Sequence, residues 1–166
     1  MGKKLLILGA GSYGRVAYEV AMSTEKYELV SFLDDDISKN GVVGQLCEYE
    51  TYAKDYECAF IAIGNPGLRK EWFCKLKDAG YVMESLIHPM AYISQSAKIS
   101  EGCIVEAYAV INTNAHLLNG VIVSAGAVIN HDAQVGEFCH IDCNSVVASG
   151  KKVDEAIKVY SCEFYK

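Results

Sequence analysis

Residues 121–147 read VIVSAGAVINHDAQVGEFCHIDCNSVV, and an aliphatic side chain returns at every sixth position of this stretch. Helices repeat about every 3.6 residues and strands about every 2, so neither element explains a period of six. A hexapeptide repeat is typical of a parallel β-helix, in which each hexad contributes one short strand and one turn. The spacing extends without a break over thirteen residues: Ile87, Ile93, Ile99, Val105, Ile111, Leu117, Val123, Ile129, Val135, Ile141, Val147, Val153 and Val159.

The position two residues before the repeated aliphatic residue is usually small. One large and one small side chain per strand suit the interior of a narrow prism. Three hexads would form one triangular coil, so residues eighteen apart are expected to stack on one face and the run holds about four coils. The small residues are Ala91, Ala97, Cys103, Ala109, Ala115, Ala127, Ala133, Cys139 and Ser145.

The repeat changes character near the C-terminus. Lys151 and Ile157 stand where earlier hexads have a small residue, although the aliphatic spacing continues. We therefore expect a β-helix that is short at its C-terminus and is capped by residues 160–166. The cap would protect the exposed strand edges at that end.

The N-terminal half lacks the repeat and alternates between expected strands and helices. This alternation predicts a parallel sheet with helices packed on it. It has room for three or four strands, about half of a doubly wound nucleotide-binding fold. The strands are expected at residues 4–8, 27–33 and 57–63, and the helices at 16–23 and from about 66 to 79.

His88-Pro89 marks the border between the two parts, because the residue before proline favours extended backbone. We expect an α/β half-Rossmann domain at 1–86 and a parallel β-helix at 87–166.

Composition excludes several classes of partner. The formal net charge of −6 argues against nucleic acid and anionic membranes, and no apolar stretch is long enough to cross a bilayer. The seven cysteines are scattered, odd in number and without a CxxC pair. This usage indicates reduced thiols in a cytoplasmic protein and gives no reason to expect a metal site.

Gly9-x-Gly11-x-x-Gly14 lies between an expected strand and an expected helix. Glycines allow a tight turn and the close approach of a phosphate, and the helix N-terminus supplies N–H donors. Asp34 or Asp35, about twenty residues later, would meet a ribose hydroxyl. NAD, a nucleotide-sugar and other nucleotides all fit this pattern, and a tight turn without a ligand is the alternative.

A second glycine turn, Gly64-Asn65, ends another strand of the same sheet. Ligands bind at the carboxyl ends of such strands. The Asn65 amide could read a base or a sugar hydroxyl. Arg69, about one helical turn later, could meet a phosphate or carboxylate or be an ordinary surface residue.

One of the four histidines has an acid beside it, in the turn Asn130-His131-Asp132. A neutral histidine is a suitable general base near pH 7, and a nearby carboxylate raises its basicity and fixes its tautomer. An ordinary polar turn is the alternative. His116 and His140 occupy outward hexad positions, where histidines are usually inert.

The combination of the glycine turn with hexapeptide repeats resembles the NeuD/PglD-type sugar O/N-acyltransferases of bacterial glycan and capsule synthesis. The resemblance covers the chain to about Gly150. It is carried by four stretches: Phe32-Leu33-Asp34-Asp35-Asp36, Ala62-Ile63-Gly64-Asn65, Ile87-His88-Pro89, and residues 129–140 from Ile129 to His140.

The resemblance implies that the domain at 1–86 binds a nucleotide-sugar and that the β-helix at 87–166 is left-handed and carries the acyltransferase activity. It also implies a role for each of these stretches. The diphosphate of a nucleotide-sugar would lie over Gly9 to Gly14, along Gly11, Ser12 and Tyr13. Asp34, Asp35 and Asp36 would meet the uridine or its ribose, and Gly64 would approach the ligand. His131 would be the general base, supported by Asp132, and His140 would contact acetyl-CoA. Family members are homotrimers with active sites between neighbouring β-helices.

The leading hypothesis is an acetyl-CoA-dependent acetyltransferase that acts on a nucleotide-linked amino-sugar, with UDP as the favoured nucleotide and the choice of amine or hydroxyl left open. A second hypothesis is a non-catalytic trimeric subunit that binds a nucleotide-sugar but has a truncated CoA site. An NAD-dependent enzyme is a third hypothesis, disfavoured by the small first domain and by the hexad repeat.

Overall fold

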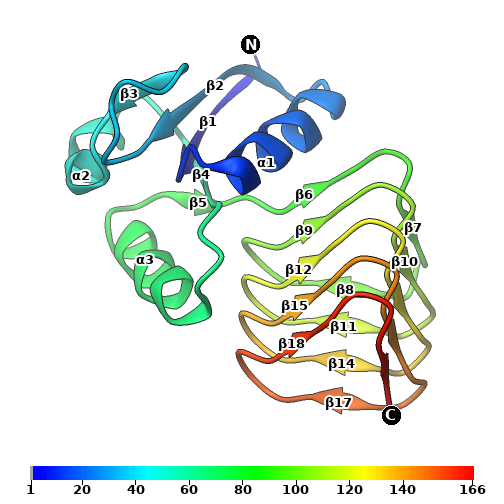
Figure 1. The fold of residues 1–166 in the computed structure, drawn as a ribbon. Helices are drawn as coiled ribbons and strands as arrows, with labels where there is room; N and C mark the ends of the chain where they lie inside the picture. Colours follow the sequence, from blue (N-terminus) through cyan, green and yellow to red (C-terminus); the bar gives the residue numbers. More distant parts are fainter. Residues whose placement is uncertain (1) are drawn as a thin grey trace. The chain divides into compact units, whose positions relative to one another are not determined.

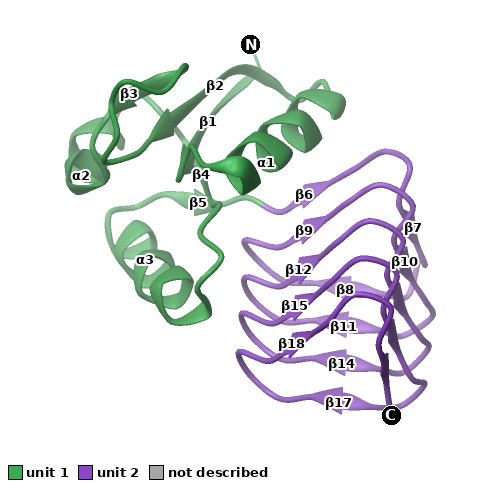
Figure 2. Ribbon diagram, in the orientation of Figure 1, with its two compact units in different colours: residues 1–84 green, residues 85–166 purple. Residues whose placement is uncertain are grey.

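The computed structural model describes residues 2–166, and the chain forms two compact units (Figure 2). Unit 1 extends to Glu84 and unit 2 comprises Ser85–Lys166. The division lies two residues before the border placed after residue 86. Its position follows from Leu86, which pairs with Ile104 and so belongs to the β-helix.

Unit 1 is built on a five-stranded parallel sheet in the order β3-β2-β1-β4-β5. The central strand β1 is apolar at four successive positions, and Leu5 to Leu8 are fully buried. Continuous burial of this kind is typical of a parallel strand covered on both faces. The strands are β1 (Lys3–Leu8), β2 (Tyr27–Leu33), β3 (Val42–Gly44), β4 (Cys58–Ile61) and β5 (Val82–Met83).

The helices of unit 1 connect these strands. They are α1 (Ser12–Ser23), the 3-10 helix η1 (Leu46–Glu48), α2 (Tyr49–Tyr52) and α3 (Pro66–Asp78). Helix α1 begins four residues before the predicted residue 16. The sheet has five strands rather than three or four, because β3 and β5 are too short to leave a sequence signal.

Unit 2 is a parallel β-helix of two-residue strands arranged in three sheets (Figure 1). Every pair of neighbouring strands joins residues eighteen apart, as in Ile111 with Ile129, which confirms the predicted stacking. We call the sheets B, C and D. Sheet B contains β6 (Leu86–Ile87), β9 (Ile104–Val105), β12 (Ile122–Val123), β15 (His140–Ile141) and β18 (Lys158–Val159).

Sheet C contains β7 (Tyr92–Ile93), β10 (Val110–Ile111), β13 (Val128–Ile129), β16 (Val146–Val147) and β19 (Phe164–Tyr165). Sheet D contains β8 (Lys98–Ile99), β11 (His116–Leu117), β14 (Gln134–Val135) and β17 (Lys152–Val153). The chain passes from B to C to D in each coil. Consequently, every coil has a B–C, a C–D and a D–B corner.

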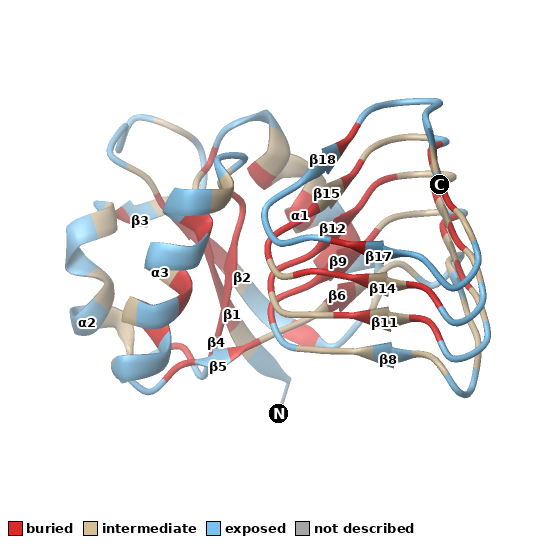
Figure 3. Ribbon diagram, turned by 90° about the horizontal axis from the view of Figure 1, so that it is seen from below, coloured by how far each residue is buried: buried red, intermediate tan, exposed pale blue. Residues whose placement is uncertain are grey.

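The interior of the β-helix is the predicted one. All thirteen repeated aliphatic residues belong to one apolar cluster or pack against it, and eight of the nine small residues do the same. The ninth, Ser145, is also fully buried. Figure 3 shows these buried positions as red segments that recur along the coils.

The corners depend on a repeated left-handed backbone conformation. One residue in every six has φ between 55° and 70°, a region that glycine, asparagine and aspartate tolerate best. Because this conformation turns the chain sharply within one or two residues, the corners stay tight enough for six-residue repeats. The residues are Gly102, Tyr108, Asn114, Gly120, Gly126, Asp132, Phe138, Asn144, Gly150, Ala156 and Cys162.

The predicted cap at residues 160–166 is wrong. Phe164 and Tyr165 form strand β19, which pairs with β16 in the same register as the earlier coils. Lys151 and Ile157 occupy small inward positions but are exposed, since no further described coil stacks on theirs. The hexad geometry therefore continues to the last residues described.

Among residues 2–166, no helix has both the length and the apolar character that a membrane crossing requires.

Candidate functional site

The three glycines of the first turn have different structural roles. Gly9 has a φ of +97°, and a side chain at Gly14 would collide with the carbonyl oxygen of Gly9. Gly9 therefore makes the turn and Gly14 lets α1 pack closely against it. Gly11 has an ordinary φ of −75°, and a Cβ there would meet no protein atom within 4 Å. The open space at Gly11 is where a ligand can approach the backbone.

The N-terminus of α1 has the features of an anion site. Gly11 is the N-cap residue and provides no capping side chain, and the first turn contains no acidic residue. The first backbone N–H groups of a helix lack intrahelical partners and carry partial positive charge. Ser12 and Tyr13 are the first residues of the helix, and a phosphate over this turn would accept hydrogen bonds from the helix N-terminus.

The three aspartates after β2 are not equivalent. Asp34 Oδ2 accepts a hydrogen bond from Ala10 N at 2.7 Å, and its Oδ1 pairs with Lys39 Nζ at 2.8 Å. Burial alone would raise the pKa of Asp34, but the bonds from Lys39 and the backbone of Ala10 and Asp36 hold it below its usual value. Asp34 thus holds the glycine turn in place through its bond to Ala10. Asp35, by contrast, is exposed.

Asp36 shapes its own loop. Its Oδ1 accepts from the Ser38 hydroxyl at 2.6 Å and from the Ser38 N–H at 3.2 Å. These two bonds hold the pKa of the Asp36 carboxyl below its usual value. Asp35 is therefore the aspartate of the three best placed to reach a ligand.

The second turn is held by residues that the sequence had suggested for ligand contact. Asn65 caps α3, and its side-chain oxygen accepts from Leu68 N at 3.0 Å. Arg69 is buried and donates to the carbonyl oxygens of Ile63 and Gly64 at 2.9 and 3.0 Å. The alternative that Arg69 lies on the surface is wrong, because the residue is buried and its guanidinium fixes the backbone of the turn. Gly64 is exposed and has open space around it.

His131 and Asp132 form a close pair at a C–D corner of unit 2. His131 Nδ1 lies 2.8 Å from Asp132 Oδ2, and both side chains are more than half exposed. Hydrogen bonds from His131 and from Asn114 hold the pKa of Asp132 below its usual value, so the residue is a carboxylate at neutral pH. With Nδ1–H donating to that carboxylate, His131 Nε2 keeps its lone pair for a proton. The arrangement is that of a general base and its orienting acid.

His140 has neighbours that the sequence did not indicate. Its Nε2 lies 3.1 Å from the Ser124 hydroxyl and 3.8 Å from Asp142 Oδ1. Asp142 also pairs with Lys158 at 3.1 Å. Ser124 stands sixteen residues before His140, on the preceding coil, so only the coil length could have revealed this contact.

The structure brings some of the predicted residues together and separates others. The turns after β1, β2 and β4 lie at one end of adjacent strands, so Gly11, Asp35 and Gly64 share one edge of the sheet. In unit 2, His131 is at a C–D corner and His140 projects from sheet B. Sheet B is the face opposite the C–D corner, and one β-helix alone does not unite the two histidines.

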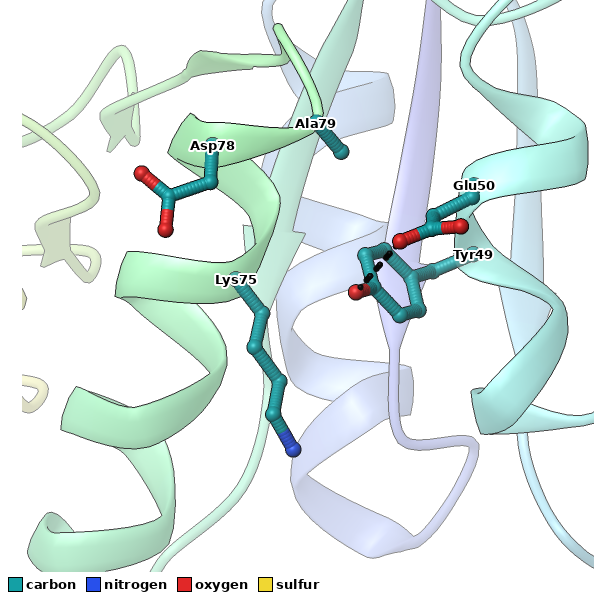
Figure 4. Close-up of a pocket in the computed structure, with 5 residues that line it drawn as sticks. All are labelled: Tyr49, Glu50, Lys75, Asp78 and Ala79. Atoms are coloured by element: carbon teal, nitrogen blue, oxygen red, sulfur yellow. Dashed lines mark hydrogen bonds between the residues drawn. The ribbon is translucent and has the colours of Figure 1, made fainter.

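A shallow pocket of about 400 Å³ in unit 1 lies away from these residues (Figure 4). It is lined by Tyr49, Glu50, Lys75, Asp78 and Ala79, at the end of α3 farthest from Gly64. Tyr49 donates to Glu50, and Lys75 pairs with Glu71 at 2.6 Å. None of the predicted site residues lines this pocket.

Comparisons with known proteins agree with the fold. Residues 4–76 match the PglD N-terminal domain family. A UDP-N-acetylbacillosamine N-acetyltransferase of Bacillus subtilis (strain 168) is 29% identical over 113 residues. The aligned part is 63% of this chain and 52% of that protein, so the chain spans about half the length of its curated relative.

Solved structures extend the similarity over both units. The acetyltransferase domain of PglB from Neisseria gonorrhoeae FA1090 has a TM-score of 0.89 at 27% identity, covering 99% of this chain and 92% of that one. The same domain in complex with acetyl coenzyme A gives a TM-score of 0.86. PerB from Caulobacter crescentus, with CoA and GDP-perosamine, is 23% identical with a TM-score of 0.85, covers 100% of this chain and 89% of that one, and shows the shared fold. The predicted fold class and the predicted resemblance are confirmed.

Proposed function

We propose that this protein is an acetyl-CoA-dependent N-acetyltransferase that acts on a nucleotide-linked amino-sugar, with UDP as the nucleotide. The observation that carries the proposal is the exposed His131–Asp132 pair, with Nδ1 to Oδ2 at 2.8 Å, on a β-helix corner. A phosphate-binding turn in unit 1 accompanies it. The Bacillus relative supports a UDP-linked amino-sugar, and the PglB domain supports acetyl-CoA as donor.

In the proposed reaction, the sugar amine attacks the carbonyl carbon of the acetyl thioester. His131 Nε2 removes a proton from the amine nitrogen as the N–C bond forms. The tetrahedral intermediate collapses, the C–S bond breaks, and the CoA sulfur leaves as a thiolate that receives a proton. Asp132 stabilises the imidazolium formed during attack, because its carboxylate lies against Nδ1–H.

In unit 1, the proposed diphosphate lies over Gly9 to Gly14 and accepts hydrogen bonds from backbone N–H groups at the start of α1. Gly11, Ser12 and Tyr13 run along it, and Gly64 leaves room on the adjacent strand. Asp35 is the proposed contact for the ribose or uracil, since Asp34 and Asp36 bond to their own loop. Acetyl-CoA is proposed to contact His140. The seven free cysteines fit a cytoplasmic site for this reaction.

We further propose a homotrimer, on the basis of the outer face of sheet C. Five apolar side chains form a stripe along this face from the first coil to the last, and we call it the C stripe. Tyr92 and Phe164 are 60% and 58% exposed at its ends. Contiguous exposed apolar side chains often mark a surface that meets another protein. The members of the C stripe are Tyr92, Val110, Val128, Val146 and Phe164.

A trimer would also bring His131 of one copy near His140 of a neighbouring copy. Three copies around an axis contact each other through two different surfaces, so a corner of one copy meets a face of the next. The C–D corner that bears His131 borders the C stripe. In the proposed assembly this corner approaches sheet B of a neighbour, where His140 projects.

Val128→Glu is expected to convert the trimer to monomers, because it places a carboxylate in the middle of the C stripe. Burying an unpaired carboxylate costs several kcal/mol, and each trimer would bury three. Sedimentation velocity at micromolar concentration measures the change. Gln134→Glu, on the outer face of sheet D, is the matched control and should remain trimeric. A trimeric Val128→Glu would show that the C stripe is not the interface.

A ligand panel tests the proposed function. UDP-amino-sugar, GDP-amino-sugar, NAD, acetyl-CoA and CoA are added separately, and the shift in melting temperature reports binding to the folded protein. The proposal requires shifts with a nucleotide-amino-sugar and with acetyl-CoA, and release of CoA when both are present. A shift with the nucleotide-sugar alone, without transfer, would instead support a non-catalytic binding subunit.

A further inference from the structure

We infer that Asn114 is a positioning residue that orients His131 through Asp132. The inference rests on the proposed role of His131 as the general base. Asn114 lies one coil before Asp132, at the preceding C–D corner, and the two residues are eighteen apart in the chain. Neither the glycine turn nor the His131–Asp132 motif points to Asn114.

The geometry gives each oxygen of the Asp132 carboxylate its own partner. Asn114 Nδ2 donates to Oδ1 at 3.0 Å, and His131 Nδ1 lies 2.8 Å from Oδ2. Two bonds on opposite oxygens fix the plane of the carboxylate. A fixed carboxylate selects the Nδ1–H tautomer of His131 and directs Nε2 outward.

The exposure of the pair explains why a third residue matters. The side chains of His131 and Asp132 are 61% and 56% exposed. Water competes for exposed pairs, and rotamer freedom weakens them further. A single contact between neighbours on a surface turn would therefore hold the ring poorly, and the amide of Asn114 supplies the missing restraint.

Asn114 is itself held in place. Its backbone N–H donates to the Ser96 hydroxyl at 3.0 Å, one coil earlier, and its φ of 58° is left-handed. Asp132 has the matching φ of 60°. Both side chains consequently leave the corner from the same type of turn, stacked one above the other.

A second asparagine–carboxylate pair joins two stacked corners in the same way, but no histidine belongs to it. At the D–B corner, Asn119 Nδ2 donates to Glu137 Oε1 at 2.8 Å, again across eighteen residues. Asn119 is therefore a control for Asn114, since its loss removes the same kind of bond between stacked corners, together with a bond that its Oδ1 accepts from Glu101 N at 3.3 Å.

The first test replaces Asn114 with glycine in the full-length protein. Glycine occupies equivalent left-handed positions at Gly102, Gly120 and Gly126, so the change removes the side chain without backbone strain. We expect kcat to fall about tenfold, as for loss of an outer residue that orients a reacting one. KM for both substrates and the melting temperature should stay close to those of the wild type, and Asn119→Gly should leave kcat unchanged.

Two further variants separate positioning from a structural role. Asn114→Asp keeps the size and the left-handed preference but loses the donor, so it should not restore activity. In an Asp132→Ala background, Asn114→Gly should cause no further loss of kcat. Wild-type kcat in Asn114→Gly, restored activity in Asn114→Asp, or additive losses in the double variant would each overturn the inference.

A measurement that does not depend on catalysis separates the inference about Asn114 from the proposed function. Nitrogen-15 NMR of the neutral imidazole reports which ring nitrogen carries the proton. We expect the Nδ1–H form of His131 in the wild type and a shift toward the Nε2–H form in Asn114→Gly. An unchanged tautomer overturns the inference even if the enzyme is active, whereas a wild type without transfer but with this shift refutes the proposed function alone.

Discussion

His131→Ala is expected to lower kcat for acetyl transfer by about 10²–10⁴-fold, the range that a general base contributes. Without the imidazole, the attacking amine has no base at hydrogen-bond distance to take its proton. KM should change little, because the residue acts on the reacting atoms rather than on the nucleotide. Steady-state release of CoA, followed with a thiol reagent, measures both constants.

Two further variants test whether the loss of kcat is specific to His131. Asp132→Ala should cost less than His131→Ala, since the carboxylate only orients the ring and stabilises its charge. His116→Ala should be nearly silent, because His116 lies on the outer face of sheet D with Ser100 as its neighbour at 3.5 Å. All three positions are at the surface of unit 2, so folding should persist. Full activity in His131→Ala would refute the proposed mechanism.

Gly11→Val is expected to weaken nucleotide-sugar binding by about a hundredfold or more. The new side chain would fill the open space over the turn and keep a phosphate from the first N–H groups of α1. Losing two bonds to a charged group, at about 1.5 kcal/mol each, corresponds to that factor. Isothermal titration calorimetry with the UDP-amino-sugar measures it, and the melting temperature without ligand should stay near that of the wild type.

Gly14→Val provides the contrast, because a side chain there collides with the Gly9 carbonyl. Overpacking against backbone should lower the free energy of unfolding by about 3 kcal/mol, and the melting temperature of unit 1 should fall. If Gly11→Val binds the nucleotide-sugar like the wild type, the glycine turn serves only the fold.

The fold could be predicted because its strongest signals are local and repeated. The spacing from Ile87 to Val159 fixes the coil length, and the coil length fixes which residues stack. Strands β3 and β5 escaped prediction, since runs of three and two residues are stabilised by neighbours in the sheet rather than by their own pattern. The role assigned to residues 160–166 was wrong for a related reason: the aromatic side chain of Tyr165 takes an aliphatic position.

The candidate site was predicted only in part. The pair His131–Asp132 is contiguous in sequence, so its contact could be expected. The contacts Asn114–Asp132 and Ser124–His140 join residues eighteen and sixteen apart, and they appear only once the coils are stacked. The surface alternative for Arg69 was wrong, because a charged side chain near a turn can also be buried to hold backbone carbonyls.

The constant offset of eighteen residues between stacked strands limits how the length of unit 2 can change. Inserting one residue within the coils would turn every later inward aliphatic side chain outward, and inserting six would rotate all later strands onto the next sheet. Only the gain or loss of a whole coil restores sheets, corners and interior together. Asn114 and Asp132 are eighteen residues apart, so deleting a coil from this stretch would remove one of the two partners, and inserting a coil between them would separate them. The β-helix can therefore lengthen or shorten in evolution by complete coils before Asn114 or after Asp132. The two coils that carry Asn114 and the His131–Asp132 pair must stay adjacent.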